Sequence, residues 1–326
     1  MRSSNKRTFV VYTSACCTML LLASLGIFRP IGVREAAVIF FLETGQILQI
    51  PTESETEPTE PAETQPPELS ETQPPETQPE QLPLFSAGDA ALVKLQNLSG
   101  YDTDVEAWLE HPLNWELQQS QPTVLILHSH GTESYADTKS DNYRSLNTGK
   151  NVVSVGEALA RLLEKAGIGV IHDKSMHDSP SYDDSYPNSR RSAQAYLDKY
   201  PTIQLVLDLH RDSMMDSSGN QIRYALETDR GTAAKMMFVV GTDAGGQSHE
   251  KWPENMSLAV KLQALLEKQT PGICRPINFR TQRFNQDLST GAVLVEMGSA
   301  ANSREEVLRS VQLLADAIIA LSKGTE

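Results

Sequence analysis

The sequence predicts an α/β fold with a mostly parallel sheet and helices on both faces, preceded by a transmembrane helix and a disordered linker. From residue 123 onward, short apolar runs of strand length alternate with longer segments whose apolar residues recur at helical spacing. This alternation is typical of parallel sheets covered by helices. An uncharged amino-terminal run and a segment rich in Pro and Glu come before it, and they predict the anchor and the linker.

The anchor is expected within residues 1–30. Residues 8–28 carry no charge, and a helix of this length spans roughly 31 Å, enough for the hydrocarbon core of a bilayer. Arg2, Lys6 and Arg7 precede it, so the amino terminus is expected in the cytoplasm and the rest outside. A cleaved signal peptide is the alternative, but 28–30 (Phe-Arg-Pro) is a poor cleavage site. We therefore expect a single-pass protein of the cell membrane with an extracytoplasmic domain.

The linker is expected at residues 51–83, after a short apolar, membrane-proximal segment at 31–50. Residues 51–83 contain nine Glu and no Lys or Arg, and they repeat the motif ETQPPE. A segment with so little to bury stays disordered. It also accounts for most of the formal net charge of −14, leaving about −5 elsewhere. A nucleic-acid partner is not expected without a basic surface.

The folded domain is expected at residues 84–326, with its core at 120–322. Five apolar runs predict strands, at 123–128, 168–172, 203–210, 236–241 and 292–297. Four segments with helical spacing predict helices, at 151–167, 189–200, 255–269 and 305–322. Gly167 follows the first of these as a C-cap. Neither GxGxxG nor GxxxxGK[ST] occurs, so a nucleotide site has no local support.

Polar residues gather where three of the expected strands end. His130 and Glu133 follow the first strand, His210 and Arg211 close the third, and Glu296 lies within the last. Ligands of open α/β sheets bind outside the carboxyl ends of the strands. Histidine and carboxylate ligands around one ion, beside a free carboxylate that can take a proton, are what a catalytic zinc site requires. The three strand ends therefore predict a metal site.

Other readings of these residues are weaker. A serine hydrolase of the α/β class usually shows GxSxG, which is absent. Cys274 is alone in the expected domain and is interpreted as a small buried apolar residue. His172 and His177 are interpreted as loop caps, and His111 and His249 are expected to be exposed.

Four segments carry a resemblance to a known family. Residues 125–135 (LILHSHGTESY), 142–173, 200–213 (YPTIQLVLDLHRDS) and 284–303 (FNQDLSTGAVLVEMGSAANS) resemble the stage II sporulation protein P family, over about residues 120–322. These are peptidoglycan hydrolases of endospore-forming bacteria, and their fold and site resemble those of zinc-dependent N-acetylmuramoyl-L-alanine amidases. The resemblance thus implies an amidase-like fold and a Zn²⁺ cofactor.

The resemblance also assigns roles to residues. His130 and His210 match zinc ligands of the amidase pattern, and Glu296 matches its catalytic carboxylate. The amidases take a Glu ligand from the start of the next helix, where residues 147–150 of this sequence hold no carboxylate. Glu133 is the natural substitute, and His128 is the alternative. Arg211 is expected to bind a stem-peptide carboxylate or to steady a ligand, or else to pair with a neighbouring Asp.

The implied activity is hydrolysis of the amide between the lactyl group of the glycan and L-alanine of the stem peptide. The family is also credited with cutting peptide cross-links. The implied partners are a glycan-cleaving enzyme and a membrane protein of the engulfment machinery, stage II sporulation proteins D and M. A catalytically inactive wall-binding module is the alternative, although such a module needs no proton-transferring Glu296.

Overall fold

The computed structural model describes residues 84–324 except 114, 118 and 119. Its centre is a seven-stranded sheet in the order β1-β8-β7-β9-β4-β2-β3. The strands are β1 (Leu95–Asn97), β2 (Val124–Leu127), β3 (Val170–His172), β4 (Leu205–Asp212), β7 (Met236–Val240), β8 (Ile277–Phe279) and β9 (Ala292–Ser299). Every neighbouring pair is parallel except β7 and β9. The prediction of a mostly parallel sheet is confirmed.

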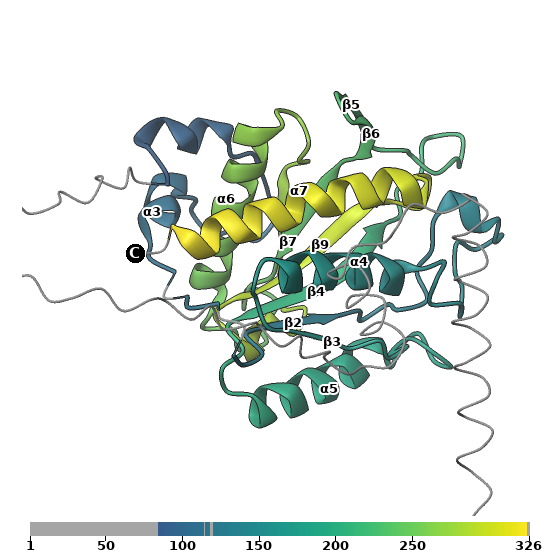
Figure 1. Ribbon diagram of the computed structural model, residues 1–326, viewed down its shortest axis with the longest axis horizontal. Coiled ribbons are helices and arrows are strands. Elements are labelled where there is room, and N and C mark those ends of the chain that lie inside the picture. Colours follow the sequence, from purple (N-terminus) through teal and green to yellow (C-terminus); the bar gives the residue numbers. More distant parts are fainter. Residues whose placement is uncertain (1–83, 114, 118–119, 325–326) are drawn as a thin grey trace, which may run out of the picture. The chain divides into compact units, whose positions relative to one another are not determined.

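Helices cover the two faces of the sheet unequally (Figure 1). One buried apolar cluster joins the sheet to α3 (Val105–Glu110), α4 (Val152–Lys165), α6 (Trp252–Gln269) and α7 (Arg304–Lys323). A smaller cluster joins the opposite face to α5 (Ser185–Lys199). The remaining elements are a hairpin of β5 (Ala225–Thr228) and β6 (Gly231–Ala234), and three short 3-10 helices, η1 (Ala87–Leu92), η2 (Ala136–Thr138) and η3 (Gln286–Leu288). Beside α5, Phe284 packs on Met237, Val239 and Leu294 of the same face.

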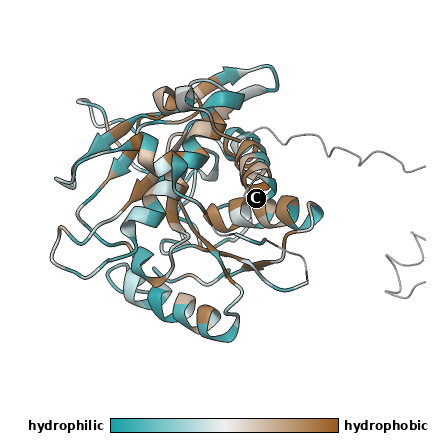
Figure 2. Cartoon of the chain, turned by 90° about the vertical axis from the view of Figure 1, so that its left-hand side faces the viewer, coloured by the Kyte–Doolittle hydropathy of each residue, from teal (hydrophilic) through white to brown (hydrophobic). Residues whose placement is uncertain are grey.

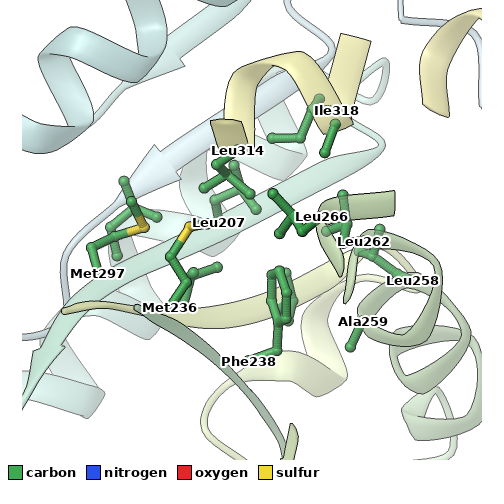
Figure 3. Close-up of a cluster of buried hydrophobic side chains, with 14 of the residues drawn as sticks. Leu207, Met236, Phe238, Leu258, Ala259, Leu262, Leu266, Met297, Leu314 and Ile318 are labelled. Atoms are coloured by element: carbon green, nitrogen blue, oxygen red, sulfur yellow. The ribbon is translucent and has the colours of Figure 1, made fainter. Parts of the chain in front are cut away.

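The core follows from the alternation of side chains along the strands. Met236 and Phe238 of β7 point to the α6–α7 face and are completely buried there, with Met297 of the neighbouring strand β9 and Leu207 of β4 beyond it (Figure 3). Met237 and Val239 point to the other face. Brown apolar residues line the inner sides of the helices, while teal polar residues face outward (Figure 2). Since both faces bury apolar residues, the strands read as continuous apolar runs.

The predicted elements are recovered with shifted ends. The helix predicted at 189–200 begins earlier, at Ser185, and the last strand extends to Ser299. Cys274 is buried as predicted. His111 is exposed as expected, but His249 is only 1% exposed, so the expectation for it was wrong.

The expected anchor, membrane-proximal segment and linker lie outside the described residues. Within the part of the chain that the structure does describe, no helix combines the length and the apolar character needed to cross a bilayer.

Candidate functional site

Three neighbouring parallel strands, β9, β4 and β2, bring the candidate residues to one edge of the sheet. In the β4–β9 register His210 lies directly opposite Glu296, and β2 pairs with the other side of β4. The chain leaves β2 after Leu127 and turns through His130 and Glu133. A hydrogen bond of 3.0 Å from the Glu133 N–H to the His130 carbonyl closes this turn. The structure thus places the four residues together at the carboxyl ends of the strands.

The side chains of His130, His210 and Glu133 face one another. The two imidazole rings lie with centroids 5.3 Å apart and at 88° to each other. Nδ1 of His210 is 3.6 Å from Oε2 of Glu133. All three residues are buried. Two imidazoles and one carboxylate therefore share a single buried space.

Asp208 contacts the ring nitrogen of His210 that does not face Glu133. Its Oδ1 is 2.9 Å from Nε2 of His210, and the carboxylate accepts hydrogen bonds from the backbone and hydroxyl of Ser129, at 2.8 and 2.6 Å. Burial on its own lowers the pKa of His210, but the carboxylates of Asp208, Glu133 and Glu296 outweigh it and raise this pKa to about 10. A carboxylate on one ring nitrogen orients the ring and directs the other nitrogen, Nδ1, toward Glu133.

Glu296 carries the most strongly perturbed carboxyl group of the site. Burial raises its pKa to about 8, against the opposing effect of His210, and the charges of Glu133 and Asp212 add to the rise. Its Oε2 is buried and has no hydrogen-bond partner among the described residues. A carboxyl group that can hold or release a proton near neutral pH is thereby fixed next to His210.

Arg211 lies behind Glu133 and is only 5% exposed. Its backbone N–H donates to Oε2 of Glu133 at 3.0 Å, and its Nη1 lies 3.4 Å from Oε1. The rest of the guanidinium donates to the carbonyls of Ser134 and Tyr143. Of the roles predicted for Arg211, this geometry corresponds to steadying a ligand, and its ion pair is with Glu133 instead of Asp208 or Asp212.

His128 points away from this group. Its Nδ1 lies 3.0 Å from the Leu209 carbonyl and its Nε2 lies 2.9 Å from Nε2 of His172. A Cβ added to Gly156 of α4 would lie 2.7 Å from the His128 ring, so the helix packs directly on this side chain. Burial lowers the pKa of His128 to about 3, which keeps the ring neutral. The geometry therefore favours Glu133 over His128 as the partner of His130 and His210.

The residues present fit a metal ion. Nδ1 of His130 and Oε2 of Glu296 are buried without hydrogen-bond partners in the described part of the chain, and Nδ1 of His130 has only an ion-pair contact of 4.0 Å with Asp178. A cation here would offset the carboxylates around Glu296, and two imidazoles with one carboxylate are a donor set typical of zinc. Within residues 84–324, except 114, 118 and 119, no three or more His, Cys, Asp or Glu side chains lie close enough together to hold a metal ion as they stand.

Two tyrosines that the sequence analysis did not single out enclose His130. Tyr182 stacks on its ring at 4.5 Å and Tyr186 meets it edge-on at 5.5 Å. The Arg144 guanidinium lies 4.6 Å from the centroid of the Tyr182 ring, and its Nη1 lies 2.8 Å from Asp178. These side chains come from loops and the start of α5, so no spacing in the sequence connects them with His130.

Comparisons with known proteins identify the family. A protein-family model described as stage II sporulation protein P matches residues 38–319. Stage II sporulation protein P of Bacillus subtilis (strain 168) is 30% identical over 208 residues, 59% of this chain and 49% of that protein. The chain thus spans about half the length of this curated relative.

Solved structures with partial similarity include two amidases. N-acetylmuramoyl-L-alanine amidase AmiC2 of Nostoc punctiforme is 12% identical, with 60% of this chain and 94% of that chain covered and a TM-score of 0.37. N-acetylmuramoyl-L-alanine amidase from Clostridium difficile 630 is 15% identical, with 61% and 93% covered and a TM-score of 0.38. Because the family model spans most of the sequence, the chain belongs to the stage II sporulation protein P family.

Proposed function

We propose that this protein is a zinc-dependent peptidoglycan hydrolase of sporulation that acts as an N-acetylmuramoyl-L-alanine amidase. The bond cleaved is the amide between the lactyl group of the glycan and L-alanine, with peptide cross-links as a second candidate bond. The observation that carries this proposal is the grouping of His130, Glu133 and His210 beside Glu296 at one sheet edge. Family membership supports the substrate class.

Each side chain of the site has its own role in the proposed reaction. His130, His210 and Glu133 would hold the zinc ion, which when bound polarises a carbonyl and lowers the pKa of water. Asp208 orients His210, and Arg211 orients Glu133. Glu296 accepts the proton of the attacking water and passes it to the amine as the C–N bond breaks. Burial raises the pKa of this carboxyl group, which favours its taking up the proton.

Wall digestion with and without a chelator tests the proposal. Purified protein should release new amino-terminal L-alanine from cell walls, and a chelator should abolish the release because the ligand set then holds no ion. Added zinc should restore it. Release of other amino termini would identify cross-link cleavage. Release that is unaffected by the chelator would contradict the assignment of a metal site.

The alternative is a module that binds the wall and recruits a separate hydrolase. Such a protein would sediment with cell walls but release no amino termini alone, with or without zinc. Oε2 of Glu296 argues against it, because this oxygen is buried without a hydrogen-bond partner among the described residues and a binding module gains nothing from that cost.

We also propose that residues 8–28 anchor the protein in the membrane with the catalytic domain outside, where stage II sporulation proteins D and M would be its partners. The basic flank and uncharged run of the sequence support this orientation. Protease added to intact protoplasts should then remove the folded domain. Complete protection until the protoplasts are lysed would place the domain inside and contradict the proposal.

A further inference from the structure

Besides the space that His130 and His210 share, a second cavity lies between the start of α5 and the loop after β8. It has a volume of about 430 Å³, and its walls come from the first turns of α5 and from the loop after β8. The lining residues that matter here are Tyr186, Arg190, Arg283, Phe284 and Asn285. Of these residues, Tyr186 also contacts His130.

The cavity adjoins the candidate catalytic site through Tyr186. This ring meets His130 edge-on at 5.5 Å, and on its cavity side it lies 6.0 Å from the Phe284 ring. Phe284 packs on the sheet face formed by Met237, Val239 and Leu294. Leu294 precedes Glu296 by two residues in β9, so both side chains point to this face. A chain held at His130 and Glu296 can therefore continue past Tyr186 into the cavity.

The polar wall of the cavity is positively charged. Arg190 makes two hydrogen bonds to Asp287, at 2.8 and 2.7 Å, and Nε of Arg283 contacts the same carboxylate at 3.1 Å. Two guanidinium groups thus share one carboxylate, and their side chains remain 35% and 22% exposed. Each guanidinium has five N–H donors in a fixed plane, so donors remain free for a further carboxylate.

The loop that carries Phe284 is fixed before any ligand arrives. Phe284 and Asn285 both have left-handed backbone angles, with φ of 52° and 60°, which non-glycine residues adopt at an energetic cost. Nδ2 of Asn285 offsets this cost by donating to the Tyr186 carbonyl at 2.9 Å and to the Ser189 hydroxyl at 3.2 Å. These bonds fasten the loop to α5. Strained segments held in this way are common in ligand clamps.

We propose that this cavity is the subsite for the stem peptide, with Arg190 and Arg283 binding one of its carboxylates and with Tyr186 and Phe284 packing against its backbone. This inference rests on the proposed function and specifies which part of the substrate lies on which side of the catalytic residues. The matching chemistry is a peptide with a free carboxylate.

Binding of two synthetic peptides tests the subsite without turnover. One is a stem peptide that begins with L-alanine and has free carboxylates; the other is the same peptide with those carboxylates amidated. By calorimetry, wild-type protein should bind the free acid about tenfold or more tightly than the amide, because hydrogen bonds to a charged group are lost on amidation. Equal affinity, or no binding of either peptide, would overturn the proposal.

Substitutions show which arginines cause the preference for the free acid. The pair of changes Arg190→Gln and Arg283→Gln should remove the preference for the free acid. Arg161→Gln, which alters an exposed arginine of α4 paired with Glu157, should retain it. Arg190→Lys keeps the positive charge and should retain part of the preference. It is the control for the possibility that the double variant loses the preference because it is misfolded. A preference undiminished in the folded double variant would place the carboxylate elsewhere.

Turnover of two soluble muropeptides, one with free carboxylates and one with amidated carboxylates, tests the subsite and the proposed function independently. Wild-type protein should cleave the free acid with a lower KM than the amidated form and with a similar kcat. Cleavage of both with equal KM would end the subsite proposal and leave the hydrolase intact. Cleavage of neither, together with carboxylate-dependent binding, would end the proposed function and leave the subsite.

Discussion

Glu296→Gln should reduce wall hydrolysis by about 10²–10⁴-fold while the zinc content stays near one ion per chain. Glutamine keeps the shape of the side chain at its place opposite His210 in the β4–β9 register. It removes the group that accepts the proton from water, and it leaves His130, His210 and Glu133 unchanged. Wall-hydrolysis rate and metal content by atomic spectroscopy, measured on the same preparation, check this.

A matched substitution tests whether the effect is local. Glu227 also lies in a strand, but in the exposed hairpin of β5 and β6 away from the sheet edge. Glu227→Gln should leave the rate within about twofold, as expected of surface changes of this kind. If Glu296→Gln lost its zinc and Glu133→Ala kept it, the roles of ligand and base would have to be exchanged.

His130→Ala and His210→Ala should lose both the metal and the activity, with hydrolysis falling to the level of protein treated with chelator. Each change removes one of two imidazoles in a site with few donors, and the remaining groups cannot complete the coordination shell. Metal content per chain and wall-hydrolysis rate are the measurements. His111→Ala, at the exposed end of α3, is the control and should change neither. Retention of a full complement of zinc by His210→Ala would contradict the ligand assignment.

The same measurement decides between Glu133 and His128 as the third ligand. Glu133→Gln keeps an acceptor for the Arg211 N–H but removes the charge, and it should shed metal. His128→Ala should keep its metal, because that ring is directed to the Leu209 carbonyl and to His172. It should lower the unfolding temperature instead, since it opens a gap beneath α4. The opposite pattern of metal content would make His128 the ligand.

The direction of one strand was not predictable from alternation alone. The runs that become β2, β4, β7 and β9 are strongly apolar because both faces of the sheet are covered, and periodicity identifies them. Parallel neighbours require a crossover, usually a helix. Between β4 and β7 the chain forms the β5–β6 hairpin instead, and β7 runs antiparallel to β9. The strands β1, at one edge of the sheet, and β8 beside it are three residues long, too short to give a period.

The candidate site divides in the same way. His130, His210 and Glu296 were predictable because strand ends of a parallel sheet meet at one edge. Tyr186, Arg190 and Arg283 were not predictable as site residues. The first two come from α5 and the third from the loop after β8, and no strand end marks these positions in the sequence. His249 was misjudged for a similar reason: its neighbours in sequence are polar, and only the tertiary packing buries it.

The place of β9 in the sheet has a consequence for synthesis. It is the last strand along the chain, yet it lies between β4 and β7 and brings Glu296 to His210. A chain made from its amino end therefore presents the proposed ligands His130, Glu133 and His210 before the strand that carries Glu296, and the centre of the sheet stays open until that strand arrives. We therefore expect a polypeptide that stops before β9 to be inactive.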